Sequence, residues 1–120
     1  MDEKLQRALD ASNFRLNLLN LKENIALRVE TLSIYAVNGG IFKVNRELIS
    51  FVKIILDSEK TSVVLIDDNN NPIEIQDIPA FYSAILDRYF QATNFYHVEY
   101  TKLKRMRSSH DMLADPGKDT

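Results

Sequence analysis

The first 38 residues constrain the fold most, because residues 2–38 contain neither Pro nor Gly and are rich in Leu. This composition predicts one long helix over 2–38. At about 1.5 Å rise per residue, such a helix is more than about 40 Å long. We expect it to end at Asn38, Gly39 and Gly40, which can adopt the left-handed conformation that closes helices.

This predicted helix carries two apolar stripes on roughly opposite faces. The first stripe contains Phe14, Leu18, Leu21, Ile25, Val29, Leu32 and Ala36. The second contains Leu5, Leu9, Leu16, Leu19, Leu27, Ile34 and Val37. A helix with two stripes is expected to have a partner on each side, and in so short a chain we expect one partner to be another chain.

A row of asparagines lies between the stripes, at Asn13, Asn17, Asn20 and Asn24. It is interpreted in two ways. It is either a solvent-exposed face or a polar seam that sets the register of a helical oligomer, since buried Asn can specify alignment.

The middle of the chain predicts a short strand and a buried helix. Ile41, Phe42 and Val44 favour a strand over 41–44. Asn45 is a plausible N-cap for a helix over 46–60. That segment has so little polar surface that we expect it to be the most buried helix.

Residues 62–77, "SVVLIDDNNNPIEIQD", predict a β-hairpin with a polar turn. A two-stranded hairpin alone is marginally stable. We therefore expect 41–44 to supply a third strand and the sheet to pack on helix 46–60. Strand 63–66 is apolar on both faces, so we expect it to be central or covered on both sides.

A third helix is predicted over 78–107, with Asp77 as its cap and Pro79 in its first turn. Its apolar seam follows a 3–4 spacing through Tyr82, Ile85, Tyr89, Ala92, Tyr96, Leu103 and Met106. We expect the two long helices to pair with each other and with copies of themselves. The candidate oligomer interface comprises Leu18, Leu21, Ile25, Tyr82, Tyr89 and Tyr96.

These elements predict an α+β fold with two long helices, one shorter buried helix and a small antiparallel sheet. The expected organisation is a single domain over 1–107 followed by a flexible C-terminal tail over 108–120, which contains Pro116 and Gly117.

Charge and composition exclude several classes of protein. Lys and Arg total 15 and Asp and Glu total 17, which is too balanced to indicate a nucleic-acid or membrane partner. The absence of Cys excludes disulfides, thiolate catalysis and Cys-ligated zinc. No segment has the apolar length of a membrane helix or a signal peptide, so we expect no membrane partner.

No catalytic or metal motif is present, and we expect a non-enzymatic protein without cofactor or small-molecule substrate. The oxygens of Asp67, Asn69 and Asn71 resemble part of a calcium loop, but Pro72 and Ile78 stand where an EF-hand needs Gly and Glu. A simple turn is favoured. The two histidines, His97 and His110, lack carboxylates at metal-binding spacing.

A basic run at Lys102, Lys104, Arg105 and Arg107 is the best candidate for contact with an acidic partner or nucleic acid. The simpler interpretation is that these cations complement the dipole at a helix C-terminus. A nucleic-acid-binding or transcription accessory role is therefore the alternative function.

Three stretches resemble a small, largely uncharacterised protein of T4-type tailed phages, especially those of marine cyanobacteria. They are "NGGIFKVNRELISFVK", "VVLIDDNNNPIEIQD" and "YFQATNFYHVEYTKLKRMRS", and the resemblance covers residues 1–107. It implies a structural or morphogenesis component, located in the cytoplasm of the infected host cell or in the virion. It implies no functional residue. Together, the pattern and the resemblance predict an assembly protein that acts through helix-mediated oligomerisation.

Overall fold

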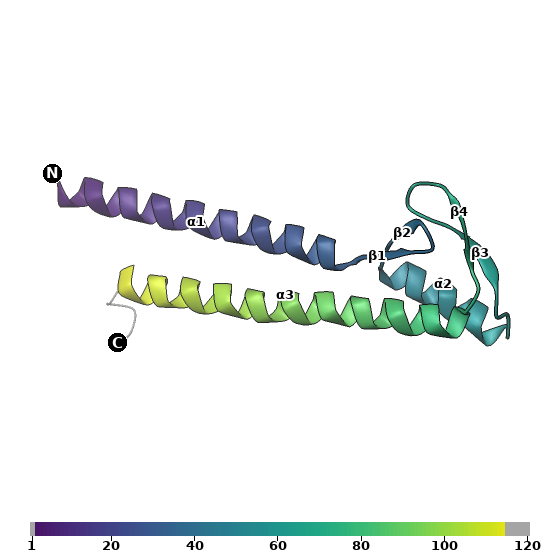
Figure 1. Ribbon diagram of the computed structural model, residues 1–120. Helices are drawn as coiled ribbons and strands as arrows, with labels where there is room; N and C mark the ends of the chain where they lie inside the picture. The colour runs from purple at the N-terminus through teal and green to yellow at the C-terminus, as the bar shows by residue number, and fades with distance from the viewer. Residues whose placement is uncertain (1, 115–120) are drawn as a thin grey trace. The chain divides into compact units, whose positions relative to one another are not determined.

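The computed structural model describes the backbone of residues 2–114 and the side chains of residues 2–110. The element order is α1 (Glu3–Leu32), β1 (Ile34–Val37), β2 (Gly40–Lys43), α2 (Arg46–Asp57), β3 (Val63–Ile66), β4 (Pro72–Ile75) and α3 (Ile78–Ala114) (Figure 1). The α+β fold class is confirmed. The chain divides into two compact units, and α1 and α3 contribute residues to both.

Unit 1 comprises residues 1–28 and 96–120, and in its described part α1 lies beside α3. Phe14 stacks on His110, whereas Lys22, further along α1, shares a hollow with Tyr100, earlier in α3. The two helices therefore run antiparallel. The first apolar stripe of α1 faces this pairing, with Leu18 buried and Phe14 and Ile25 half-buried.

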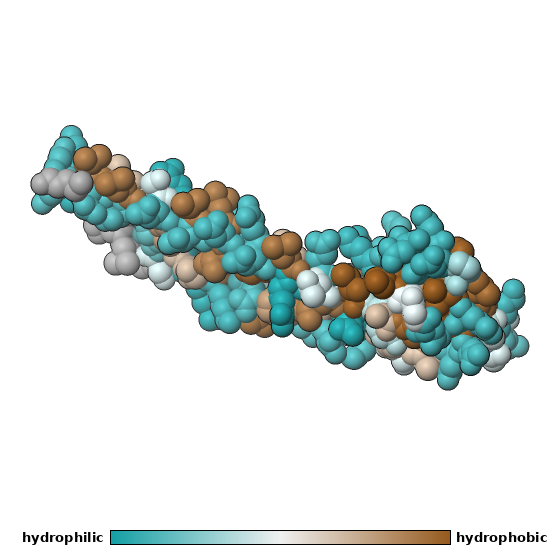
Figure 2. Space-filling model, turned by 45° about the horizontal axis from the view of Figure 1, so that its top comes forward, coloured by the Kyte–Doolittle hydropathy of each residue, from teal (hydrophilic) through white to brown (hydrophobic). Residues whose placement is uncertain are grey.

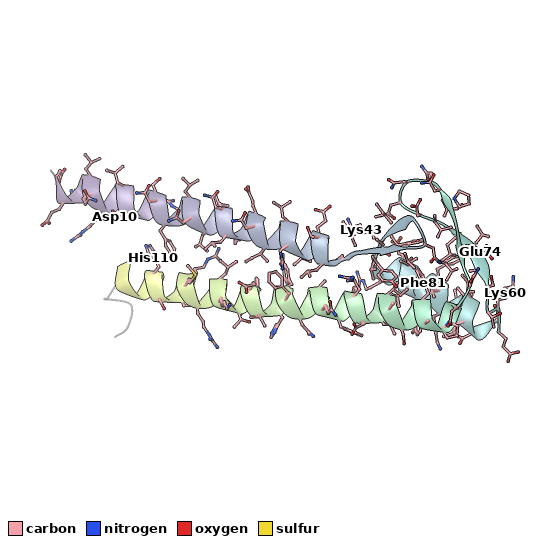
Figure 3. All side chains as sticks on the ribbon, in the orientation of Figure 1. Asp10, Lys43, Lys60, Glu74, Phe81 and His110 are labelled. Atoms are coloured by element: carbon pink, nitrogen blue, oxygen red, sulfur yellow. The ribbon has the colours of Figure 1, made fainter. Side chains whose placement is uncertain are left out.

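Unit 2, residues 29–95, contains most of the buried apolar side chains. Two β-hairpins and α2 pack against the first half of α3, and Phe81, labelled in Figure 3, lies in this core. The core consists of Phe42, Val44, Val52, Leu65, Ile73, Ile75, Ile78, Phe81 and Ile85. Burying a side chain of this size contributes about 1.5–3 kcal/mol, so unit 2 is the better stabilised unit.

The prediction of one helix over 2–38 was wrong at its end. The helix stops at Leu32, and residues 34–37 form β1, which pairs antiparallel with β2. Asn38 and Gly39 have φ of 50° and 81°. Positive φ at both central residues is what a two-residue type I′ hairpin turn needs. The same two residues can close a helix, but here they turn a hairpin.

The expected third strand exists but pairs differently. β2 joins β1, while β3 joins β4, so the described residues form two separate two-stranded sheets. Gly40 explains how closely the hairpins approach. A Cβ at this position would lie 2.5 Å from Cγ1 of Ile73 in β4, so any other residue here would force Ile73 to shift.

The predicted caps are confirmed. The backbone N–H of Leu48 donates to the Asn45 side chain at 2.8 Å, and that of Ala80 donates to Asp77 at 3.1 Å. Helix α2 ends at Asp57, three residues earlier than predicted. Residues 108–114, expected in a tail, continue α3, and residues 115–120 lie outside the described part.

Two burial predictions were wrong. α3 is more buried than α2, because it buries Ile78, Phe81 and Ile85 as well as Ala92 and Leu103. In α2 only Val52 is buried, and Phe51 and Ile54 are 53% and 66% exposed. Strand β3 is not covered on both sides. Its Leu65 points into the core, but Val64 and Ile66 lie on the surface of the chain.

Candidate functional site

The polar turn between β3 and β4 holds the two hairpins together. One Asp67 oxygen accepts from the backbone N–H groups of Asn69 and Asn71, and the other accepts from that of Ile41, at 2.8–3.0 Å. The next residue, Asp68, accepts from the backbone N–H of Lys43 at 3.0 Å. The turn therefore binds the edge of β2.

Electrostatics at Asp67 follow from this geometry. The hydrogen bond from the Ile41 N–H, helped by those from Asn71 and Asn69, lowers the pKa of the Asp67 carboxyl below its usual 3.8. Its carboxylate is almost fully covered, and both its oxygens already accept protein N–H groups. These oxygens therefore stabilise the turn and its contact with β2. Among the described residues, no group of three His, Asp or Glu side chains could hold a metal ion.

The exposed surface of α1 is the second feature. Leu5, Leu9, Leu16 and Leu19 are 43–57% exposed. Their spacing of 4, 7 and 3 residues places them at a and d positions of one heptad frame, with Ser12 as the polar residue between them. We call these four leucines the outer face of α1. They belong to the second stripe predicted from the sequence, while the first stripe packs inside the chain.

The candidate interface residues lie mainly on the packed side. Leu18 is buried in unit 1, and Tyr82 and Tyr89 pack against the core of unit 2. Ile25 is half-buried, Leu21 is on the border of exposure, and Tyr96 is 48% exposed. The four asparagines of the row are all exposed.

A second apolar surface lies on unit 2, where Phe51 and Ile54 of α2 and Val64 of β3 line one hollow. All three side chains are more than half exposed. We call them the α2–β3 patch. Sequence reasoning found their apolar character but placed them in the core. Figure 2 shows apolar residues, in brown, interrupting the hydrophilic surface of both units.

The four residues of the basic run have different surroundings on α3. Lys102 pairs with Glu99 at 3.2 Å, and Arg105 lines neither of the hollows in unit 1 described below. Lys104 lines one of those hollows and Arg107 lines both, in each case together with Lys22 of α1. Sequence reasoning missed the contribution of α1, because the register between two distant helices cannot be read from either helix.

Two adjacent hollows together form what we call the cationic groove of unit 1. Arg15, Lys22, Arg107 and His110 line the first, and Lys22, Lys104 and Arg107 line the second beside Tyr100. His110, labelled in Figure 3, is half-buried and stacks on Phe14 with ring centroids 3.7 Å apart. The other histidine, His97, is exposed on α3.

No family model, curated protein or solved structure matches this chain. Across the described residues, no helix is both long and apolar enough to cross a membrane. The fold and its surfaces define a small α+β protein with a helical pair, an apolar core in unit 2 and apolar side chains exposed on both units.

Proposed function

We propose that this protein is a non-enzymatic assembly protein that self-associates through the outer face of α1. The observation that carries this proposal is the exposure of four leucines at heptad positions, Leu5, Leu9, Leu16 and Leu19. Each is already about half covered, so burying the rest would contribute about half of the ~1.5–3 kcal/mol of a complete Leu burial. A single chain on its own leaves all four exposed and lacks this stabilisation.

The spacing of these leucines indicates the kind of partner. Side chains at a and d positions pack into the surface of another helix. A second copy of α1 presents the same four leucines. Symmetric pairing of identical surfaces is the commonest way in which soluble chains assemble. In the same heptad frame Asn13 and Asn20 occupy e positions beside the leucines and would contribute to the polar rim that surrounds apolar interface cores, whereas Asn17 and Asn24 occupy b positions away from them.

The α2–β3 patch supports assembly beyond a single pair of chains. It belongs to unit 2, whereas the outer face belongs to unit 1. Contiguous exposed apolar side chains mark contact sites in soluble proteins. A chain with two such surfaces can contact two neighbours, as a component of a larger assembly must.

The resemblance to small proteins of T4-type tailed phages adds a biological setting to the proposal. In this setting the chain is a structural or morphogenesis component, acting in the cytoplasm of the infected host cell or within the virion. The proposal assigns it no cofactor, because its activity would lie in contacts between chains.

Multi-angle light scattering behind size exclusion tests the proposal. The mass of the wild-type protein should be that of two or more copies of the 13.8 kDa chain. The double variant Leu9→Asp/Leu16→Asp should run as a single chain, because it would place two charges in the apolar interface.

The matched control is Asn17→Asp/Asn24→Asp, which adds the same charge to α1 away from the leucines. It should keep the wild-type mass. A wild-type protein of 13.8 kDa at every concentration, or an assembled leucine variant, would refute the proposal.

A further inference from the structure

We propose that the cationic groove of unit 1 binds single-stranded nucleic acid. The groove is built by both helices, with Arg15 and Lys22 from α1 and Lys104 and Arg107 from α3. Lys22 and Arg107 line both hollows, so the hollows are continuous. The groove adjoins the outer face of α1, because Leu19 also lines its first hollow, but this inference does not rest on the self-association proposed above.

In the described part of the chain, the groove has cations without matching anions. No described Asp or Glu lines either hollow. Among the described side chains, the ion pairs are Lys53–Asp57 and Lys102–Glu99, so the four groove cations are in neither. Placing like charges together costs energy unless an anion joins them. The groove is therefore suited to an anionic ligand.

The charge is also unevenly divided between the units. Unit 1 contains ten Lys or Arg and eight Asp or Glu residues, and unit 2 contains five and nine. Unit 1 is thus net positive and unit 2 net negative, although the whole chain has a formal charge of -2. The nearly balanced total conceals a local positive surface that can attract phosphates.

The length of the groove suits a chain of phosphates. Arg15 and Lys22 are seven residues apart on α1, which is about 10 Å along a helix. Phosphates of one strand follow one another at about 3.4 Å along a duplex axis and further apart when the strand is extended. The groove cations can therefore contact two or three successive phosphates.

Aromatic rings beside the cations favour a single strand over a duplex. Tyr96 and Tyr100 stack with centroids 6.0 Å apart and an interplanar angle of 10°, and both are about half exposed. Tyr100 lines the groove with Lys104 and Arg107. Unpaired bases stack on such rings, which contributes about 1–3 kcal/mol per base. Bases inside a duplex are not free to do so.

Fluorescence anisotropy with a labelled 20-nucleotide dT strand tests this inference on the full chain. Binding should weaken as salt rises. The variant Lys104→Ala/Arg107→Ala should bind at least about tenfold more weakly and lower the salt slope by about 1.4, since each phosphate contact contributes about 0.7 on single strands. Tyr100→Ala should also weaken binding at least about fivefold.

The control is Lys102→Ala/Arg105→Ala, which removes the same charge from the same helix outside the groove. It should weaken binding less than about threefold. Equal losses in both double variants would mean that general charge attracts the strand and would overturn the proposal. Absence of dT binding at 50 mM salt, or equally tight binding of a duplex of the same length, would also overturn it. Circular dichroism would confirm that each variant keeps its helices.

Discussion

Asp67 shows how one side chain can organise the connection between two hairpins. Its carboxylate takes three backbone N–H groups, two from its own turn and one from β2. Asn70 in the same turn has a φ of 62°, a conformation that Asn tolerates better than most residues. The run of Asp and Asn is thus explained by local backbone geometry.

We predict that Asp67→Asn lowers the melting temperature at pH 7, because a neutral amide is a weaker acceptor and cannot serve all three N–H groups. The pKa of Asp67 is lowered in the folded state, mainly by the Ile41 N–H. Its contribution is therefore present above the unfolded pKa of about 3.8 and is lost as the pH falls through the folded pKa. The difference between variant and wild type should shrink below about pH 4.

Thermal melts by circular dichroism between about pH 7 and 2.5 check this prediction. The control is Asp57→Asn, because the exposed ion pair of Asp57 with Lys53 contributes little to stability and its loss should change the melting temperature little. A constant difference across this pH range would contradict the role given to the Asp67 charge.

At the scale of elements, the sequence predicted the presence of most helices and strands but not how they pair. The caps at Asn45 and Asp77 and the hairpin in 62–77 follow from local chemistry, so they could be predicted. Residues 34–37 could not be assigned from their flanking turn, because Asn38-Gly39 suits both a helix end and a hairpin. The hairpin is stabilised over a longer helix because β2 packs in the core, with Phe42 buried and Gly40 against Ile73.

The two stripes of α1 illustrate the same limit. Both are rich in Leu, and nothing local distinguishes the stripe that packs inside the chain from the one that faces out. The choice depends on the register with α3, where Phe14 meets His110. For the same reason, the sequence indicated the basic residues of α3 but not their α1 neighbours.

The two stripes should respond differently to truncation. Leu18→Ala removes a buried side chain and should lower the free energy of unfolding by about 2–3 kcal/mol at any protein concentration. Leu16→Ala, on the outer face, should reduce stability only at concentrations where chains associate. Urea unfolding at two protein concentrations about a hundredfold apart separates these cases. A concentration-independent loss at Leu16 would show that this side chain is buried within its own chain.

At the scale of the whole molecule, apolar burial is concentrated in unit 2 and apolar exposure occurs on both units. Unit 1 has few fully buried side chains among its described residues, chiefly Leu18 and Leu103. Because this helical pair has so small a core, a further helix that covers the outer face of α1 would increase its stability. Self-association through α1 would therefore stabilise the less stable unit.

Thiol labelling tests this central claim most directly, because the chain contains no Cys and one introduced thiol is the only target. Leu16 is 57% exposed in the single chain. If copies associate through the outer face, maleimide should label Leu16→Cys at least about tenfold more slowly than Asn17→Cys, and dilution should remove the difference. Equal labelling rates at all concentrations would contradict the claim that another chain covers this face.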